Sequence, residues 1–267
     1  MKTIQNIPDS ILSRLGPVFE YQLSSFRKDA GSKGYLKNPK ETVSEIDITS
    51  EQMIRDILHS IIPEAAFYGE ETEQSRSDKL TWVVDPIDGT SNYLNGIDLW
   101  SVSIALLENH SPIAACIVRP VNRETFTAVK GKGAFINGSK LSPVKTSNIS
   151  NALIGTGMPY RTPESKDAFF SCAREVLNMC RDIRRMGSAA IDLAYVGANF
   201  LQGFWEIDLQ PYDVAAALLI MKETGCICTD AAGNKYDMFS SRTCTAGHPG
   251  VHEKLVSLTE KYYREFV

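Results

Sequence analysis

The chain has 267 residues, of which 43% are hydrophobic, 22% charged and 9% aromatic. This is the composition of a globular protein with a sizeable core, and it excludes a disordered chain or a coiled coil. The formal net charge is -4 and no long block of Lys or Arg occurs, so no footprint for a nucleic-acid backbone is visible and nucleic acid is not expected as the main partner.

Long apolar stretches are absent from the sequence. No segment approaches the run of about 20 apolar residues that crosses a bilayer, and residues 1–16 contain no signal-peptide core. The six cysteines are scattered, and the one close pair, Cys226 and Cys228, fits neither a zinc ribbon nor a redox motif. We therefore expect a cytoplasmic protein with reduced, buried thiols and no membrane partner.

The first 63 residues predict two helices with a loop between them. Residues 8–28 place apolar side chains at helical intervals. Residues 49–63 begin with a capping-box pattern, Thr49 with Gln52, and end at a proline. Residues 31–47 are rich in Gly and Lys, which predicts a mobile loop or a short hairpin.

Strand patterns dominate from residue 65 onwards. Runs of β-branched and aromatic residues over 65–136 predict successive antiparallel pairs in a first sheet. From residue 152 strands alternate with helices, which predicts a mixed sheet covered on both faces. We expect an N-terminal α+β half over 1–145, which carries the metal and phosphate motif, and a C-terminal α/β half over 146–267, packed as one compact unit.

The stretch WVVDPIDGT runs an apolar strand directly into two aspartates. Pro86 fixes a turn, so Asp85 and Asp88 can converge where the strand ends. Two close carboxylates repel each other unless a cation lies between them. Oxygen ligands in this arrangement suit Mg²⁺, which predicts a magnesium site here.

The residues that follow favour a phosphate beside that metal. Gly89 lets the backbone approach a ligand closely, and Thr90 with Ser91 would begin a helical turn whose exposed N–H groups bind an anion. Taken alone, an Asp-rich turn is also consistent with a capped loop. The six-residue string DPIDGT is more specific than that.

Three motifs together resemble the inositol monophosphatase family of Mg²⁺-dependent, lithium-sensitive phosphatases. They are GEE at 69–71, DPIDGT at 85–90 and PYDVAAA at 211–217. GKGAFING from residue 131 and RRMGSAAIDLAYVGAN from residue 184 extend the similarity over most of the chain. The resemblance implies the layered αβαβα sandwich of the sugar-phosphatase group, of α+β class, and a homodimer.

The resemblance also implies the chemistry and its residues. A small phosphate monoester would be hydrolysed by metal-activated water, with two or three Mg²⁺ ions per subunit. The implied metal ligands are Glu70, Asp85, Asp88, Asp213 and the Ile87 carbonyl. Thr90 paired with Asp47 would orient and deprotonate the water, with Glu70 as a further catalytic residue. Gly89, Thr90 and Ser91 would hold the phosphate, and Glu206 would contact substrate hydroxyls. Beyond what the resemblance implies, we expect Asp208 and Ala189 to contact the substrate as well. Glu71 is expected to hydrogen-bond behind the metal ligands, with a solvated neighbour as the alternative.

Physical alternatives remain for two of these carboxylates. Asp213 opens a predicted helix, where an Asp is also a routine cap that suits the helix dipole. Asp208 stands where many inositol-phosphate hydrolases of the family have Gly, and EIDLQPYD looks more like the spelling of some histidinol-phosphatase relatives. A carboxylate there would favour a cationic leaving group, unless it points to bulk water.

The loop before Asp47 departs from the family pattern as well. A lysine and an Asp-x-Val-Thr element are common there, whereas this chain has Leu36 and then Glu41, with Lys37 and Lys40 nearby. Inositol monophosphate is the leading substrate. Histidinol phosphate, adenosine 3′,5′-bisphosphate and fructose bisphosphate are alternatives, and a metal-binding regulatory scaffold is the alternative that is not an enzyme.

Overall fold

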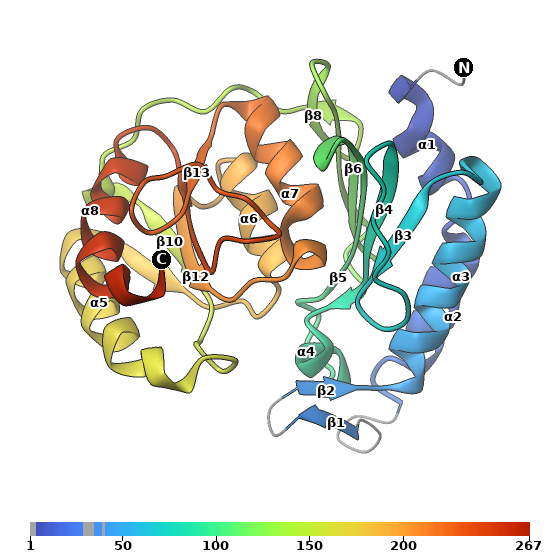
Figure 1. Ribbon diagram of the computed structural model, residues 1–267, viewed down its shortest axis with the longest axis horizontal. Coiled ribbons are helices and arrows are strands. Elements are labelled where there is room, and N and C mark those ends of the chain that lie inside the picture. The colour runs from blue at the N-terminus through green and yellow to red at the C-terminus, as the bar shows by residue number, and fades with distance from the viewer. Residues whose placement is uncertain (1–3, 29–34, 39–40) are drawn as a thin grey trace.

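The computed structural model describes residues 4–28, 35–38 and 41–267, and for residues 35–38 and 41–43 it describes the backbone alone. Figure 1 shows five layers, helix, sheet, helix, sheet and helix, in the order α1 to α3, first sheet, α6 with α7, second sheet, α5 with α8. The expected αβαβα sandwich is thereby confirmed.

The bounds of the helices are as follows. The α-helices are α1 (Ile7–Leu12), α2 (Gly16–Ser25), α3 (Glu45–Ile61), α4 (Thr90–Leu94), α5 (Lys166–Met179), α6 (Ala189–Gly197), α7 (Pro211–Thr224) and α8 (Val251–Tyr263). Short 3-10 turns occur at Ile4–Asn6, Ile149–Asn151, Pro163–Ser165 and Arg264–Phe266.

Seven strands form the first sheet, in the order β3-β4-β5-β6-β7-β8-β9. They are β3 (Ala66–Gly69), β4 (Leu80–Asp88), β5 (Ser101–Glu108), β6 (Ser111–Arg119), β7 (Glu124–Val129), β8 (Gly133–Ile136) and β9 (Ser139–Lys140). Neighbours are antiparallel except β3 and β4, which are parallel. The prediction of antiparallel pairs was wrong at this edge, because residues 70–79 carry the chain back to the end from which β3 started.

The outer layer begins with two helices where one was predicted over residues 8–28. The chain turns at residues 13–15, and Pro17 lies in the first turn of α2, where its missing N–H leaves no helical bond unmade. β1 (Tyr35–Asn38) and β2 (Glu41–Val43) then pair as a short antiparallel hairpin, one of the two predicted outcomes.

Helix α3 begins four residues before the predicted capping box at Thr49. Ser44 is the cap instead: its hydroxyl accepts from the backbone N–H of Asp47, and the Asp47 carboxylate accepts from the Ser44 N–H. The predicted start was wrong because two cap signals lie close together and only the first has its reciprocal partner.

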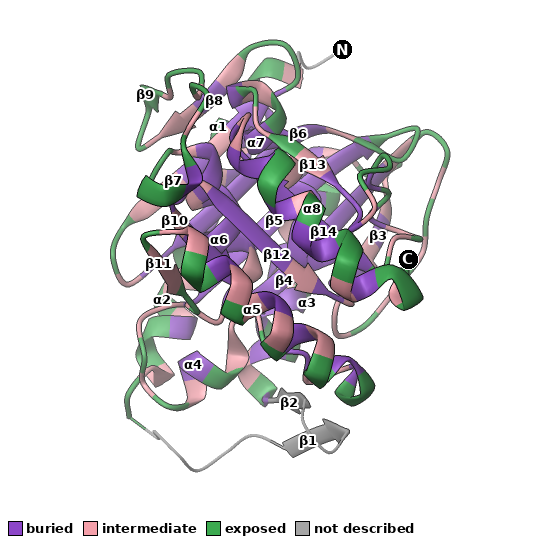
Figure 2. Cartoon of the chain, turned by 90° about the vertical axis from the view of Figure 1, so that its left-hand side faces the viewer, coloured by how far each residue is buried: buried purple, intermediate pink, exposed green. Residues whose placement is uncertain are grey.

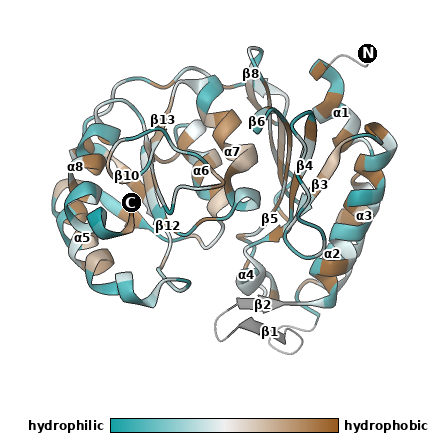
Figure 3. Ribbon diagram, in the orientation of Figure 1, coloured by the Kyte–Doolittle hydropathy of each residue, from teal (hydrophilic) through white to brown (hydrophobic). Residues whose placement is uncertain are grey.

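The middle layer is apolar on all sides. Helix α7 buries most of its residues between the two sheets, with Ala215, Ala216 and Ala217 each at most 1% exposed. Figure 2 shows buried residues concentrated on the strands and exposed ones on the outer faces of α5 and α8. Figure 3 shows the same division in hydropathy, with hydrophobic colour on β5 and α7.

Five strands form the second sheet, in the order β11-β10-β12-β14-β13. They are β10 (Leu153–Thr156), β11 (Asp182–Arg184), β12 (Gly203–Ile207), β13 (Ile227–Thr229) and β14 (Thr243–Gly247). β10 pairs in parallel with β11 and β12, and β14 is antiparallel to β12 and β13, so the predicted mixed sheet is confirmed. The sequence did not predict β14.

No helix in the described part of the chain is long and apolar enough to cross a membrane. The six cysteines are free thiols, three of them buried and three partly buried.

One buried carboxylate ties α3 to the segment after β3. Glu51 is fully buried, and its oxygens accept from the backbone N–H groups of Glu71 and Thr72, each at 2.8 Å, and from the Thr72 hydroxyl. A Cβ on Gly69 would lie 2.5 Å from this carboxylate, so only glycine fits there. Glu51 therefore fixes the path of the chain on both sides of Glu70.

We expect Glu51→Ala to lower the free energy of unfolding by about 2–4 kcal/mol, because two backbone N–H groups lose their acceptor. Urea denaturation followed by circular dichroism measures this. Glu45→Ala is the control on the same helix, since Glu45 is exposed, and it should cost less than about 1 kcal/mol. Equal losses in the two variants would show that the Glu51 contacts do not stabilise the fold.

Candidate metal and phosphate site

A cavity of about 400 Å³ lies at the junction of the first sheet and the middle helices. Residues of β4, α4, α6, β12 and the start of α7 line it. The lining residues are Glu70, Asp85, Ile87, Asp88, Gly89, Thr90, Ser91, Gly157, Met158, Tyr160, Arg161, Arg185, Gly187, Ser188, Ala189, Asp192, Glu206, Leu209 and Asp213. We call it the main cavity.

An irregularity in β4 places its two aspartates together. Asp85 pairs with Ser103 and Asp88 with Ser101, so three steps along β4 match two along β5. In a regular strand, residues three apart point to opposite faces, and the extra residue at this bulge allows both carboxylates to enter the main cavity. Gln22 of α2 donates to the Pro86 carbonyl at 2.9 Å and so holds the bulge from behind.

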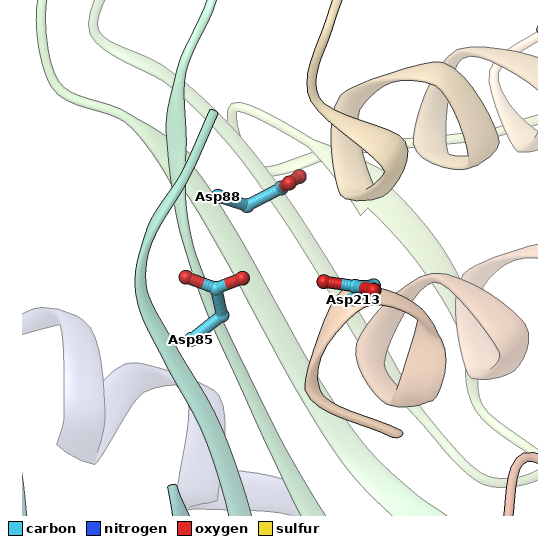
Figure 4. A group of neighbouring side chains, drawn as sticks. All are labelled: Asp85, Asp88 and Asp213. Carbon is cyan, nitrogen blue, oxygen red and sulfur yellow. The ribbon is translucent and has the colours of Figure 1, made fainter. Parts of the chain in front are cut away.

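Asp85, Asp88 and Asp213 form one cluster. Each offers a carboxylate oxygen, and these oxygens lie within 4.8 Å of one another. In Figure 4, Asp85 and Asp88 project from β4 toward Asp213, which comes from the start of α7. Glu70 lies in contact with Asp85 and adds a fourth carboxylate.

Burial and mutual repulsion change how these groups ionise. Burial, followed by the charge of Glu70, raises the pKa of Asp85 well above its usual range. Burial, followed by the charge of Asp213, raises the pKa of Asp88 to about 7. A cation between them would offset the repulsion between the carboxylates and favour their charged forms.

Protein donors hold the outer oxygens of two of the aspartates. Asp88 Oδ2 accepts from the Ser188 hydroxyl at 2.5 Å and from the Ala190 N–H at 2.7 Å. Asp213 Oδ2 accepts from the Gln210 N–H at 2.7 Å and from Arg161 Nη1 at 3.1 Å. Donors from the protein thus fix the orientation of both carboxylates.

The donor set fits a hard divalent cation. All the clustered atoms are carboxylate oxygens, the Ile87 carbonyl lies beside them, and no His or Cys lines the main cavity. Oxygen ligands suit Mg²⁺, Ca²⁺ or Mn²⁺, whereas Zn²⁺ prefers nitrogen and sulfur. Asp213 also takes part in the capping box of α7, in which its carboxylate accepts from the N–H of the N-cap residue Gln210, so this carboxylate does help to cap the helix start.

Glycine is required where the chain leaves β4. Gly89 has φ +98°, and a Cβ there would lie 3.0 Å from the Leu99 carbonyl oxygen and 3.1 Å from that of Gly187. Thr90 and Ser91 follow in the first turn of α4 and line the main cavity beside the aspartates. The three residues predicted to hold phosphate therefore share this wall.

Thr90 and Asp47 are hydrogen-bonded to each other, as the family resemblance implied. The Thr90 hydroxyl lies 2.9 Å from Asp47 Oδ1 and 3.0 Å from the Ile87 carbonyl oxygen. Burial raises the pKa of Asp47, and hydrogen bonds from Ser44 and Thr90 oppose that rise. Asp47 does not line the main cavity. It is connected to the cavity through its hydrogen bond with Thr90.

Glu206 and Ala189 also line the main cavity. Burial, followed by the charge of Asp213, raises the pKa of Glu206 to about 8. A Cβ on Gly157 would lie 1.8 Å from a Glu206 oxygen, so a larger residue at 157 would displace this carboxylate.

Asp208 lies outside the main cavity. Its carboxylate pairs with Arg242, at 3.1 Å to Nε and 3.3 Å to Nη2, and it lines a second cavity of about 400 Å³ with Arg76 and Phe239. Leu209 lines both cavities. This geometry does not support a contact between Asp208 and a leaving group in the main cavity.

Three other predicted residues have limited descriptions. The Glu71 N–H donates to Glu51, and Glu71 does not line the main cavity. Lys40 lies outside the described residues, and of Lys37 the structure describes the backbone alone.

Sequence reasoning missed three charged residues of the main cavity: Arg161, Arg185 and Asp192. Asp192 carried a signal, since it is the one charged residue in the apolar helix α6, and burial raises its pKa well above the usual range. Arg161 carried none, because the adjacent Thr162 and Pro163 predicted only the start of a helical turn.

The chain also resembles known proteins in sequence. The model of the inositol monophosphatase family matches residues 8–264. An inositol-1-monophosphatase of Rhizobium meliloti is 40% identical over 74% of this chain and 75% of its own length. The Nus factor SuhB of Escherichia coli is 33% identical over 83% of each chain.

Solved structures show the same fold. The extragenic suppressor protein suhB of Bartonella henselae has a TM-score of 0.89 at 33% identity, covering 96% of this chain and 98% of its own. An IMPase of Thermotoga maritima has a TM-score of 0.88 at 28% identity, covering 98% of this chain and 100% of its own.

The raised pKa values give a testable pH dependence. A carboxyl whose pKa is higher in the folded than in the unfolded state binds extra protons when folded, so stability falls as pH rises through that interval. In the presence of a chelator, the wild type should lose about 2–3 kcal/mol more than Asp88→Asn between pH 5 and pH 8. Thermal and urea unfolding at each pH measure this.

Asp167→Asn serves as the control, because Asp167 is exposed on α5, and it should follow the wild-type profile. If Asp88→Asn and the wild type lost the same free energy of unfolding between pH 5 and pH 8, the pKa of Asp88 would not be raised in the folded protein.

Proposed function

The chain belongs to the inositol monophosphatase family and is a hydrolase of phosphoric monoesters, and from that premise we propose that it is a Mg²⁺-dependent phosphatase of a small polyol phosphate. Inositol monophosphate is the leading substrate. The observation that carries the proposal is the convergence of three aspartates and the Thr90 hydroxyl on one cavity.

Two or three Mg²⁺ ions would be held by the residues that the family comparison implied: Glu70, Asp85, Asp88, Asp213 and the Ile87 carbonyl. Bound there, Mg²⁺ supplies a water of lowered pKa and offsets charge on the phosphate oxygens. Lithium inhibition belongs to the same proposal, since it would act through these ligands.

Thr90 and Asp47 position the attacking water. Asp47 Oδ1 accepts from the Thr90 hydroxyl, so the Thr90 oxygen presents its lone pair to a water in the cavity. The proton of that water can pass to Thr90 as the Thr90 proton passes to Asp47. Thr90 is not the nucleophile, and no covalent phosphoenzyme forms.

Gly89, Thr90 and Ser91 bind the phosphate through backbone N–H groups at the start of α4. Glu206 and Ala189 would contact the leaving group, which is supported by their place in the lining of the main cavity. A carboxylate accepts hydrogen bonds from the hydroxyls of a polyol, which supports an inositol phosphate.

Arg161 and Arg185 bear on the choice among the other substrates. Both guanidinium-bearing residues line the main cavity, and Asp208 does not. A cationic leaving group such as histidinol gains no carboxylate from Asp208 here, so histidinol phosphate ranks below adenosine 3′,5′-bisphosphate and fructose bisphosphate, whose second phosphates carry negative charge.

A second candidate role is regulatory, as a metal-binding scaffold. Relatives at 33% identity are named Nus factor SuhB, and a homodimer or another partner surface would serve such a role. The assembly state follows from size-exclusion chromatography with light scattering.

Phosphate release from a substrate panel tests the proposal. The purified protein should release phosphate from inositol 1-phosphate with a requirement for Mg²⁺, and faster than from histidinol phosphate, adenosine 3′,5′-bisphosphate or fructose 1,6-bisphosphate. Asp85→Asn should lower kcat by at least about 100-fold, because it removes a charged metal ligand. Asp78→Asn, an exposed change, should leave kcat unaltered.

Failure to release phosphate from any of these compounds, with Mg²⁺ still bound, would overturn the proposed substrates and favour either another phosphate monoester or the scaffold. In the case of the scaffold, Asp85→Asn would leave the cellular role intact.

A further inference from the structure

Arg161 places a permanent positive charge against one of the clustered aspartates. Its Nη1 lies 3.1 Å from Asp213 Oδ2 and 3.3 Å from the Asp208 carbonyl oxygen. The side chain is 21% exposed and that of Asp213 8% exposed, so the pair is largely shielded from water. A guanidinium does not lose its proton in proteins, so this charge is present at every working pH.

The orientation of Asp213 does not depend on Arg161 alone. Oδ2 also accepts from the backbone N–H of Gln210 at 2.7 Å, within the capping box that begins α7. A backbone donor at a helix start stays in place whatever residue occupies position 161. What Arg161 adds beyond this hydrogen bond is its charge.

We infer that Arg161 is an internal cation of the predicted metal centre and lowers the affinity of the aspartate cluster for a divalent cation; the inference rests on the proposed metal role of Asp213. Without a metal, the guanidinium partly neutralises the clustered carboxylates. With a divalent cation bound, two positive centres share the Asp213 carboxylate and repel each other where water screens them poorly.

Two effects of removing Arg161 oppose each other. Loss of one of the two hydrogen bonds to Oδ2 would loosen the ligand and weaken metal binding. Loss of the positive charge removes a repulsion that acts on both charges of the ion. The charge effect is the larger, because Gln210 retains the carboxylate and because a full charge close to a divalent ion acts strongly in a shielded site.

The inference predicts a weak, exchangeable metal site whose occupancy follows the cation concentration. It also predicts that a neutral residue at 161 converts it into a tight one. If Arg161 only held Asp213 in place, a neutral residue at 161 would weaken Mg²⁺ binding, because Asp213 would become disordered.

Mg²⁺ binding to the full chain, stripped with a chelator, provides the test. Isothermal titration calorimetry at pH 7.5 should show that Arg161→Met and Arg161→Gln each bind Mg²⁺ about tenfold more tightly than the wild type. Arg161→Lys, which keeps the charge, should remain within about threefold of the wild type. The Mg²⁺ concentration for half-maximal phosphate release should fall in the two neutral variants in parallel.

Arg174→Met is the control. It removes the same formal charge from an exposed arginine of α5, and its Mg²⁺ affinity should equal that of the wild type. Arg161→Gln can still donate a hydrogen bond, so it tests the charge even if the methionine variant folds poorly.

Unchanged or weaker Mg²⁺ binding by the folded neutral variants would overturn the inference while leaving the proposed function in place. Absence of Mg²⁺ binding to the wild type at any concentration would instead overturn the proposed metal site, and the inference with it. Tighter binding by Arg161→Lys as well would show that the charge is not the cause.

Discussion

Like charges buried together at the end of β4 are the constraint on which this structure depends. Asp85, Asp88 and Asp213 cannot all ionise next to one another without a positive charge close by, and burial makes the repulsion worse. Hydrogen-bond donors and the guanidinium of Arg161 supply part of the positive charge that these carboxylates need. A divalent cation would supply the rest.

Helix starts provide much of the compensation. Asp47 lies in the first turn of α3, Thr90 begins α4, Ser188 caps α6 and Asp213 lies in the first turn of α7. Each helix directs unpaired N–H groups and the positive end of its dipole toward the same region. The layered arrangement thus brings ends of helices from two layers to the bulge in one strand, and capping and function use the same side chains.

The sequence predicted the parts of this site that follow from local spacing. DPIDGT encodes a strand end, two carboxylates and a glycine turn within six residues, and the bulge and the positive φ of Gly89 are their structural expression. What joins them across the fold was harder to predict. Arg161 reaches Asp213 from 52 residues away. β14 is a short strand of small residues with two threonines, which gives no strong strand pattern, and its place follows from its partners β12 and β13.

Asp208 shows why a departure from a family pattern need not be functional in itself. Its φ is +59°, a conformation that glycine adopts without strain and that Asp tolerates better than most residues. The ion pair with Arg242 offsets the residual strain and fixes the loop, while the Asp208 carbonyl accepts from Arg161 and from the Gln210 side chain. The Asp208 carbonyl therefore helps to hold Arg161 and Gln210, the two residues that orient Asp213. The Asp208 carboxylate contacts Arg242 in the second cavity.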